Sequence, residues 1–524
     1  MLPPRLRRLG VIAATDLRLR LRRPATLWTL ALLCWLAYSI IPDPTTGRAL
    51  LVRGEARAAY SSTTIALVTA GLASMLLSFA GFYLISNGIR RDLLTRTGPI
   101  IAATAVPSAD YLLGKFLGAA GYLATVVGIY LGNILLMHFL RGEAALEPFT
   151  YLAIYLAMLG PVVLVVAAIA LCFECLPPLA GRFGDICYVV LWAVMLASGA
   201  MSDVFGGMAW LDIPGLGFAL KVVRAGTGSD QISMGMVNFD PAQPTWVLPP
   251  IHWSTGFILP RVSAILATLP FLLLARIGFH RFDPARTRTS SRPARESLLG
   301  RLGGLLHPIT RRLTTALGGL ALRAPAWLRP VLAEASLTLA LHPVGLFTLA
   351  GLSIATLVTA EPRATHLLLP LLVAGIGGLL ADLPTRDRAT GTQAMLFSTP
   401  RLRSSYATIK FAAGALIALV CVVPPAIRLG LSSPAAAASL GIGVLFLAAA
   451  ATALGLLTHS PKAFMGVFLL FFYLALNGAQ LPALDFGGWN GVATWSTRAG
   501  YAGMTVLLVG VALWSHRREL ARKW

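Results

Sequence analysis

Charged side chains are scarce in this chain. Only 12% of its 524 residues are Asp, Glu, Lys or Arg, whereas 56% are hydrophobic and the mean hydropathy is +0.75. An average soluble domain carries about 25% charged residues, and a soluble fold cannot hide this much apolar surface. The composition therefore excludes an ordinary soluble protein and predicts an integral membrane protein built of α-helices.

Acidic residues are the scarcer kind of charge. The chain has 21 Asp and Glu against 43 Lys and Arg, a net charge of +22. Such an excess can indicate nucleic-acid binding. With the N-terminus placed inside the cell, however, most Lys and Arg fall in the inner loops, while the acids divide evenly between the two sides. The excess is then the positive-inside bias of a membrane protein, and we expect no nucleic-acid partner.

Three functional signatures are missing. The dipeptide Gly114-Lys115 lacks the upstream glycine and the following hydroxyl of a phosphate-binding loop, so we expect no ATP site in this chain. No carboxylate lies at mid-span, and Glu174, near the inner end of the fourth span, is either an interfacial residue or a proton relay. The motif from Cys172 to Cys175 lacks further ligands. We therefore predict neither a metal site nor catalytic residues.

About twelve apolar stretches are long enough to cross a bilayer. The first follows an Arg-rich segment without a small-residue cleavage site, so we expect it to be retained. An even number of spans returns the C-terminus to the cytoplasmic side, where the N-terminus also lies. The predicted spans are 26–41, 63–87, 112–137, 150–172, 186–202, 262–280, 344–360, 367–381, 409–427, 435–457, 464–481 and 499–515.

The two halves of the sequence resemble each other before their first spans. Residues 6–24 form an Arg- and Leu-rich segment suited to an amphipathic elbow helix in the membrane interface, and residues 330–343 repeat the pattern about 320 residues later. In this comparison Ala13 to Asp16 corresponds to Ala333 to Ser336. The charged elbow residues are Asp16, Arg18, Arg20 and Glu334.

A second repeated pattern occupies the predicted cytoplasmic loops 88–115 and 382–410, after the second and eighth spans. Each loop has a charged start, a Thr-Gly pair, an apolar middle, a proline and a lysine entering the next span. The residues are Arg90, Arg91, Asp92, Gly98, Pro107 and Lys115 in the first loop, and Arg386, Asp387, Arg388, Gly391, Pro400 and Lys410 in the second. Two ordered matches predict a tandem duplication, with six spans per half, related by an axis along the membrane normal.

These matches predict a division into two halves, 1–280 and 330–524. The basic segment 281–329 between them is predicted to be a cytoplasmic linker that lies on anionic headgroups and is at most partly helical. The predicted external loop 203–261 is much longer than its counterpart in the second half. It forms either a loose cap or a gate or docking surface.

At the elbows and paired loops the sequence resembles the type-2 ATP-binding-cassette (ABC) transporter permeases, which are mostly bacterial exporters. The resemblance implies a transport subunit without enzymatic activity in the bacterial inner membrane. Two copies of a separate ATPase subunit, holding ATP and Mg, would dock on the loops 88–115 and 382–410 as coupling helices. The chain itself would need no cofactor, and its substrate is not indicated.

Two other functions remain open. A proton-coupled secondary transporter of the major facilitator type also has parallel halves and a basic central linker, but it would need a coupling carboxylate. A membrane enzyme acting on lipid-linked substrates would place its site in the external loop. Its candidate residues are Asp203, Asp212, Asp230, Asp240 and His252.

Overall fold

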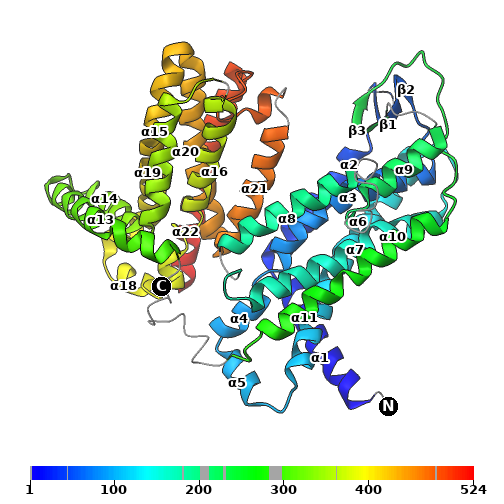
Figure 1. Cartoon of the computed structure of the whole chain (residues 1–524), viewed down its shortest axis with the longest axis horizontal. Coiled ribbons are helices and arrows are strands. Elements are labelled where there is room, and N and C mark those ends of the chain that lie inside the picture. The colour runs from blue at the N-terminus through cyan, green and yellow to red at the C-terminus, as the bar shows by residue number, and fades with distance from the viewer. Residues whose placement is uncertain are drawn as a thin grey trace. The chain divides into compact units, whose positions relative to one another are not determined.

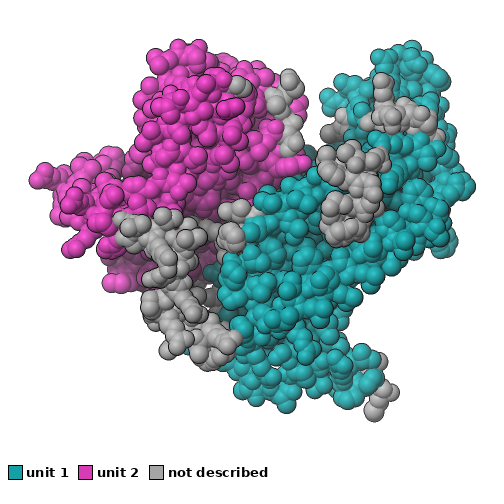
Figure 2. Space-filling view, in the orientation of Figure 1, with its two compact units in different colours: residues 1–289 teal, residues 290–524 magenta. Residues whose placement is uncertain are grey.

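The computed structural model describes residues 3–43, 45, 47–179, 182–200, 212–227, 232–282, 298–361, 363–477 and 481–523. The chain divides into two compact units, unit 1 (Met1–Thr289) and unit 2 (Ser290–Trp524) (Figure 2). Both are mostly helical, and apolar helices dominate each of them (Figure 1). The chain is therefore an α-helical membrane protein, as its composition predicts.

Unit 1 contains the elbow helix, the apolar helices and the short helices of the first paired loop. In chain order its helices are α1 (Pro4–Leu21), α2 (Pro24–Ile40), α3 (Ser62–Ile85), α4 (Gly88–Leu94), α5 (Thr97–Ala103), α6 (Ser108–Arg141), α7 (Pro148–Cys175), α8 (Arg182–Ala200), α9 (Leu216–Thr227), α10 (Thr255–Leu266) and α11 (Thr268–Gly278). Helices α3 and α7 are its inner pair, because 72% and 78% of their apolar 18-residue segments are buried.

Unit 2 begins with an additional long helix. Its helices are α13 (Leu298–Arg323), α14 (Arg329–Leu341), α15 (Pro343–Val358), the π-helix η3 (Ala364–Leu368), α16 (Leu369–Leu380), α17 (Arg386–Ala389), α18 (Gln393–Phe397), α19 (Pro400–Ser432), α20 (Pro434–Thr458), α21 (Pro461–Asn477), the 3-10 helix η4 (Pro482–Leu484) and α22 (Trp495–Lys523). Helix α20 lies at the centre of the unit and packs against α19, α21 and α22.

Helices occur at all twelve predicted span positions. Seven of the described helices are long and apolar enough to cross a membrane: α3 with α4, α6, α7, α10 with α11, α19, α20 and α22. Helix α15 is long and apolar enough only when it is taken together with α14, from which it is bent by 98°. Helices α2, α8, α16 and α21 are apolar but shorter. Several helices begin before the predicted spans, as α6 does at Ser108 and α22 at Trp495. Their first turns contain polar residues, which an apolar run does not include.

A small antiparallel sheet in unit 1 was not predicted. Its strands are β1 (Arg48–Arg53), β2 (Ala56–Arg57) and β3 (Ile232–Asn238), in the order β2-β1-β3. Strands β1 and β2 join through a tight turn in which Gly54 has φ +59°. Strand β3 comes from the predicted external loop 203–261, so a part of this loop pairs with the segment after α2.

The predicted linker 281–329 includes a long helix. Helix α13 occupies residues 298–323 and packs on the second elbow helix α14 within unit 2. The compact second unit therefore begins before the predicted boundary at residue 330. The first elbow helix, α1, packs along α6 in unit 1.

Candidate functional site

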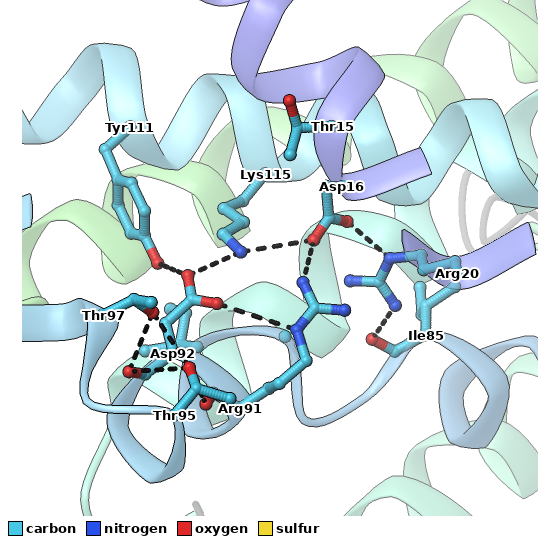
Figure 3. Close-up of polar contacts among 12 residues, drawn as sticks. Thr15, Asp16, Arg20, Ile85, Arg91, Asp92, Thr95, Thr97, Tyr111 and Lys115 are labelled. Carbon is cyan, nitrogen blue, oxygen red and sulfur yellow. Dashed lines mark hydrogen bonds and ion pairs between the residues drawn. The ribbon is translucent and has the colours of Figure 1, made fainter. Parts of the chain in front are cut away.

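The first elbow helix carries a buried carboxylate surrounded by cations. Asp16 accepts hydrogen bonds from Arg20 Nε on the same helix at 2.5 Å, from Arg91 Nη2 of α4 at 2.8 Å and from Lys115 Nζ of α6 at 3.2 Å (Figure 3). Arg20 also donates to the backbone oxygen of Ile85, the last residue of α3. One carboxylate thus joins the elbow helix, the loop helix α4 and the start of α6.

A second carboxylate extends this cluster. Asp92 accepts a hydrogen bond from the Tyr111 hydroxyl and pairs with Lys115 Nζ, both at 2.7 Å. Lys115 therefore bridges Asp16 and Asp92, and its side chain is 7% exposed. Burial would raise the pKa of Asp16, but the charges of Arg20, Lys115 and Arg91 outweigh it and lower this pKa below its usual value.

Unit 2 contains the same arrangement. Glu334 of the elbow helix α14 accepts hydrogen bonds from Lys410 Nζ of α19 at 2.5 Å and from Arg386 of α17. Lys410 also pairs with Asp387 at 2.6 Å, and the Tyr406 hydroxyl donates to Asp387 at 3.0 Å. Lys410 is 1% exposed, so it is a buried bridge between two carboxylates.

The two networks match residue for residue in the loop and the following helix. Each member of the second set lies 295 residues after its counterpart in the first, which gives the pairs Arg91 and Arg386, Asp92 and Asp387, Tyr111 and Tyr406, and Lys115 and Lys410. The same separation relates two hydroxyl pairs. Thr95 and Thr97 lie 3.0 Å apart, and Thr390 and Thr392 lie 2.9 Å apart.

This match corrects the sequence alignment of the paired loops. At a separation of 295 residues the counterpart of Gly391 is Arg96, whereas the sequence comparison paired Gly391 with Gly98. Gly391 has φ +77° and Arg96 has φ +58°, so both occupy the left-handed region. Gly98 has another role, because a Cβ there would lie 2.8 Å from the ring of Phe282. The elbow alignment shifts as well, since Glu334 rather than Ser336 takes the position of Asp16.

The remaining predicted docking residues lie on the surface. In the loops, Arg90, Pro107, Arg388 and Pro400 are exposed, and so is Arg18, which was predicted as an elbow residue. Arg388 donates to Glu519 near the end of α22 at 3.1 Å.

The apolar middle of each paired loop places a large apolar side chain at the surface. Ile100 of α5 is 66% exposed and Met395 of α18 is 79% exposed, and they too are 295 residues apart. Each unit therefore presents one large apolar side chain at an equivalent exposed position of its loop.

Glu174, the residue considered for a proton relay, accepts backbone hydrogen bonds. Its carboxylate receives the N–H groups of Gly88 at 3.0 Å and Ile89 at 2.6 Å, at the start of α4. A carboxylate there interacts favourably with the positive end of the helix. Glu174 also lines a small cavity with Arg20 and Lys115. This geometry gives Glu174 a structural role in positioning α4.

The described residues that were considered for an enzyme make separate local contacts. Asp212 is buried and pairs with Arg261 at 3.1 Å. Asp240 accepts a hydrogen bond from the backbone of Ala242 in a turn, and His252 is exposed. Asp203 and Asp230 lie outside the described residues. Among the residues that the structure describes, no group of three His, Cys, Asp or Glu is placed to hold a metal ion.

The matched networks contain cations, carboxylates and tyrosine hydroxyls but no activated nucleophile. Their geometry links an elbow helix mechanically to a loop helix and to the next apolar helix. Comparisons of the chain with known protein families, curated proteins and solved structures gave no match.

Proposed function

We propose that this chain is the transmembrane permease subunit of an ABC transporter, an exporter driven by separate ATPase subunits that dock on α4–α5 and α17–α18. In this proposal the chain is a tandem duplication with six spans in each half. Both termini and both paired loops face the cytoplasm of a bacterial inner membrane. The shorter helices α2, α8, α15, α16 and α21 complete the twelve spans.

The observation that carries the proposal is the repetition of the ion network. In each unit one lysine, Lys115 or Lys410, bridges the elbow carboxylate and the loop carboxylate. A loop that only connected two apolar helices would not need a buried bridge to the elbow. Pushing such a loop displaces the elbow and the next apolar helix together, and a transporter driven by an external motor requires this behaviour.

The exposed tips supply the contact for the motor. Ile100 projects from α5 and Met395 from α18. Thr97 and Thr392, at the starts of these helices, donate hydrogen bonds to the backbone oxygens of the network residues Asp92 and Asp387. A partner would therefore meet an apolar contact tied to the network in each unit. Two equivalent contacts favour two copies of one partner. Arg386 is unsuited to contact the partner directly because it is buried against Glu334, whereas Arg388 is 40% exposed.

The first test is to isolate the tagged full-length chain from its native membrane in a mild detergent and to measure co-purified ATP hydrolysis. We expect an ATP-binding-cassette ATPase to accompany the wild-type chain. The double variant Ile100→Glu, Met395→Glu should retain at most about a tenth of it, because a buried, unpaired carboxylate would oppose docking.

Val247→Glu is the matched control, because Val247 is 66% exposed on a segment predicted to lie on the opposite side of the membrane. This variant should retain the ATPase fully. Recovery of no ATPase with the wild-type chain, or equal recovery with the double variant, would contradict the proposal. Transport that survives ATP depletion but stops when the proton gradient is dissipated would instead support the secondary transporter.

A further inference from the structure

The long helix α13 presents an apolar stripe that the described residues of unit 2 leave exposed. Ile309, Leu313, Ala316 and Leu320 follow one another at spacings of four, three and four residues, which places them along one line of the helix. Ile309, Leu313 and Leu320 are 48%, 43% and 55% exposed. The stripe is therefore a continuous exposed apolar surface about three turns long.

A different side of α13 attaches the helix to unit 2. Ala321 and Ala324 pack with Leu332 of α14 and contact Leu416 of α19, and Thr310 is also buried. At 3.6 residues per turn, this packed side is centred about 90° from the exposed stripe. The helix is thus held by one side while the stripe remains available.

Arginines border the stripe on the side away from the packed residues. Arg312 and Arg323 lie within about 60° of the line through Ile309, whereas Arg311 lies about 160° away from it. No Asp or Glu occurs between residues 297 and 333. An apolar stripe with a basic border and no acid is the pattern of a helix that lies in a negatively charged membrane surface.

The geometry of unit 2 orients α13 accordingly. Helices α14 and α15 are bent by 98° from each other, so α14 lies nearly in the membrane plane when α15 crosses the membrane. Helix α13 packs along α14, and the two project as a hairpin from the other helices of unit 2 (Figure 1). Trp327, in the turn of this hairpin, is 72% exposed, and tryptophan favours the membrane interface.

We propose that the α13 stripe binds the anionic phospholipid headgroup region of the bilayer that holds unit 2. The stripe enters the boundary between headgroups and acyl chains, and Arg312 and Arg323 extend to the phosphates. The elbow helix α14 is then held between the membrane surface and the lysine bridge at Glu334. This binding does not depend on the substrate or on the motor.

The test uses the full-length chain with its five native cysteines replaced, reconstituted in mixed phosphatidylcholine and phosphatidylglycerol bilayers. A fluorophore attached to Leu313→Cys should be quenched by brominated lipids, whereas one attached to Thr315→Cys, away from the stripe, should be quenched by aqueous iodide. Quenching of the Leu313 label should favour brominated phosphatidylglycerol over brominated phosphatidylcholine at equal mole fraction.

Arg312→Gln should weaken this headgroup preference about fivefold, while Arg311→Gln, which removes the same charge from outside the border, should leave it nearly unchanged. Iodide quenching of the Leu313 label would overturn the proposal by showing that the stripe faces water. Protection of that label from both quenchers would overturn it as well, because the stripe would then be covered by protein. Equal effects of the two arginine variants would show that Arg312 does not border the stripe as proposed.

Discussion

The two ion networks share a plan but differ in how many cations surround the elbow carboxylate. Asp16 in unit 1 contacts Arg20, Arg91 and Lys115. Glu334 in unit 2, among the described residues, contacts Arg386 and Lys410. Thr338, four residues after Glu334 as Arg20 is after Asp16, occupies the place of the third cation and accepts a hydrogen bond from Arg386 Nη1 at 3.3 Å.

The contacts that occur in both units are the ones that the arrangement requires. The lysine bridge, the loop carboxylate and the tyrosine hydroxyl occur in both units. An arginine four residues after the elbow carboxylate occurs in unit 1, where unit 2 has Thr338. In unit 1 the carboxylate of Glu174, a residue of α7, also lies at the start of α4. Its negative charge offsets part of the extra positive charge. The shared contacts are sufficient to join elbow and loop, and the additional groups in unit 1 reinforce that joint.

Replacing the lysine bridge gives the largest expected effect. Lys410→Met leaves Glu334 with one cation and Asp387 with none among the described residues, and removal of one partner from a buried ion pair costs about 3–5 kcal/mol. Lys115→Met should cost less, because Asp16 keeps two arginines and Asp92 keeps Arg91 at 3.7 Å.

The midpoint of thermal unfolding of the purified full-length chain measures both lysine variants. Arg401→Met is the control, because Arg401 is exposed near the start of α19 and its loss should change the midpoint little. A larger loss of stability for Lys115→Met than for Lys410→Met would show that the extra cations of unit 1 do not reinforce its network.

Removing the elbow carboxylate of unit 1 should have a smaller, pH-dependent effect. We expect Asp16→Asn to cost about 2–3 kcal/mol at pH 7, because three charged hydrogen bonds weaken together. The pKa of Asp16 is lower in the folded chain than its usual value, so the unfolded chain binds the proton more readily and the carboxylate stabilises the fold above about pH 4.

The difference in unfolding midpoint between wild type and Asp16→Asn should therefore shrink as the pH falls below about 4. Glu361→Gln is a control at a half-exposed carboxylate, and its effect should be small. A difference for Asp16→Asn that stays constant down to pH 2 would contradict the assigned role of its charge.

The smallest expected effect on stability concerns the residues of the paired loops whose backbone is in the left-handed conformation. Gly391→Ala should cost about 1 kcal/mol, because a Cβ there meets no atom within 4 Å and the loss is purely conformational. Arg96→Gly, at the equivalent position, should raise stability by about 0.5 kcal/mol, since glycine removes the strain of a positive φ at some cost in unfolded-chain entropy.

Gly378→Ala is the control for this pair. Gly378 lies in α16, and a Cβ there also meets nothing within 4 Å, so alanine should be neutral or stabilising in the helix. Equal losses at Gly391 and Gly378 would show that the left-handed conformation is not what position 391 requires.

The sequence was informative where the signal is local. Apolar runs placed a helix at each predicted span. The repeated loops paired Lys115 with Lys410, but they matched Arg90-Arg91-Asp92 with Arg386-Asp387-Arg388, one residue out of step with the counterparts in the structure. The alignment failed by two residues in the loops because Thr-Gly served as the anchor, while unit 1 holds Arg96 in the conformation that glycine normally adopts. In the elbow helices, Thr338 stands at the position equivalent to Arg20. These two residue types share no property by which the sequences could have been aligned there.

Contacts between distant segments could not be predicted from the sequence. The partner of Lys115 on the elbow lies 99 residues earlier, and short strands such as β1 and β3 carry little signal of their own when their pairing spans most of unit 1. The exposure of Ile100 and Met395 likewise depends on how the short loop helices pack, since both resemble core residues in the sequence.

The three-stranded sheet has a mechanical consequence for unit 1. By pairing Arg48 to Arg53 with Ile232 to Asn238, it fastens the segment after α2 to the segment before α10. This clasp opens only when strand hydrogen bonds break, so the sheet limits how far the two segments can separate. The described residues of unit 2 form no strand, so we expect the corresponding segments of unit 2 to rearrange more easily.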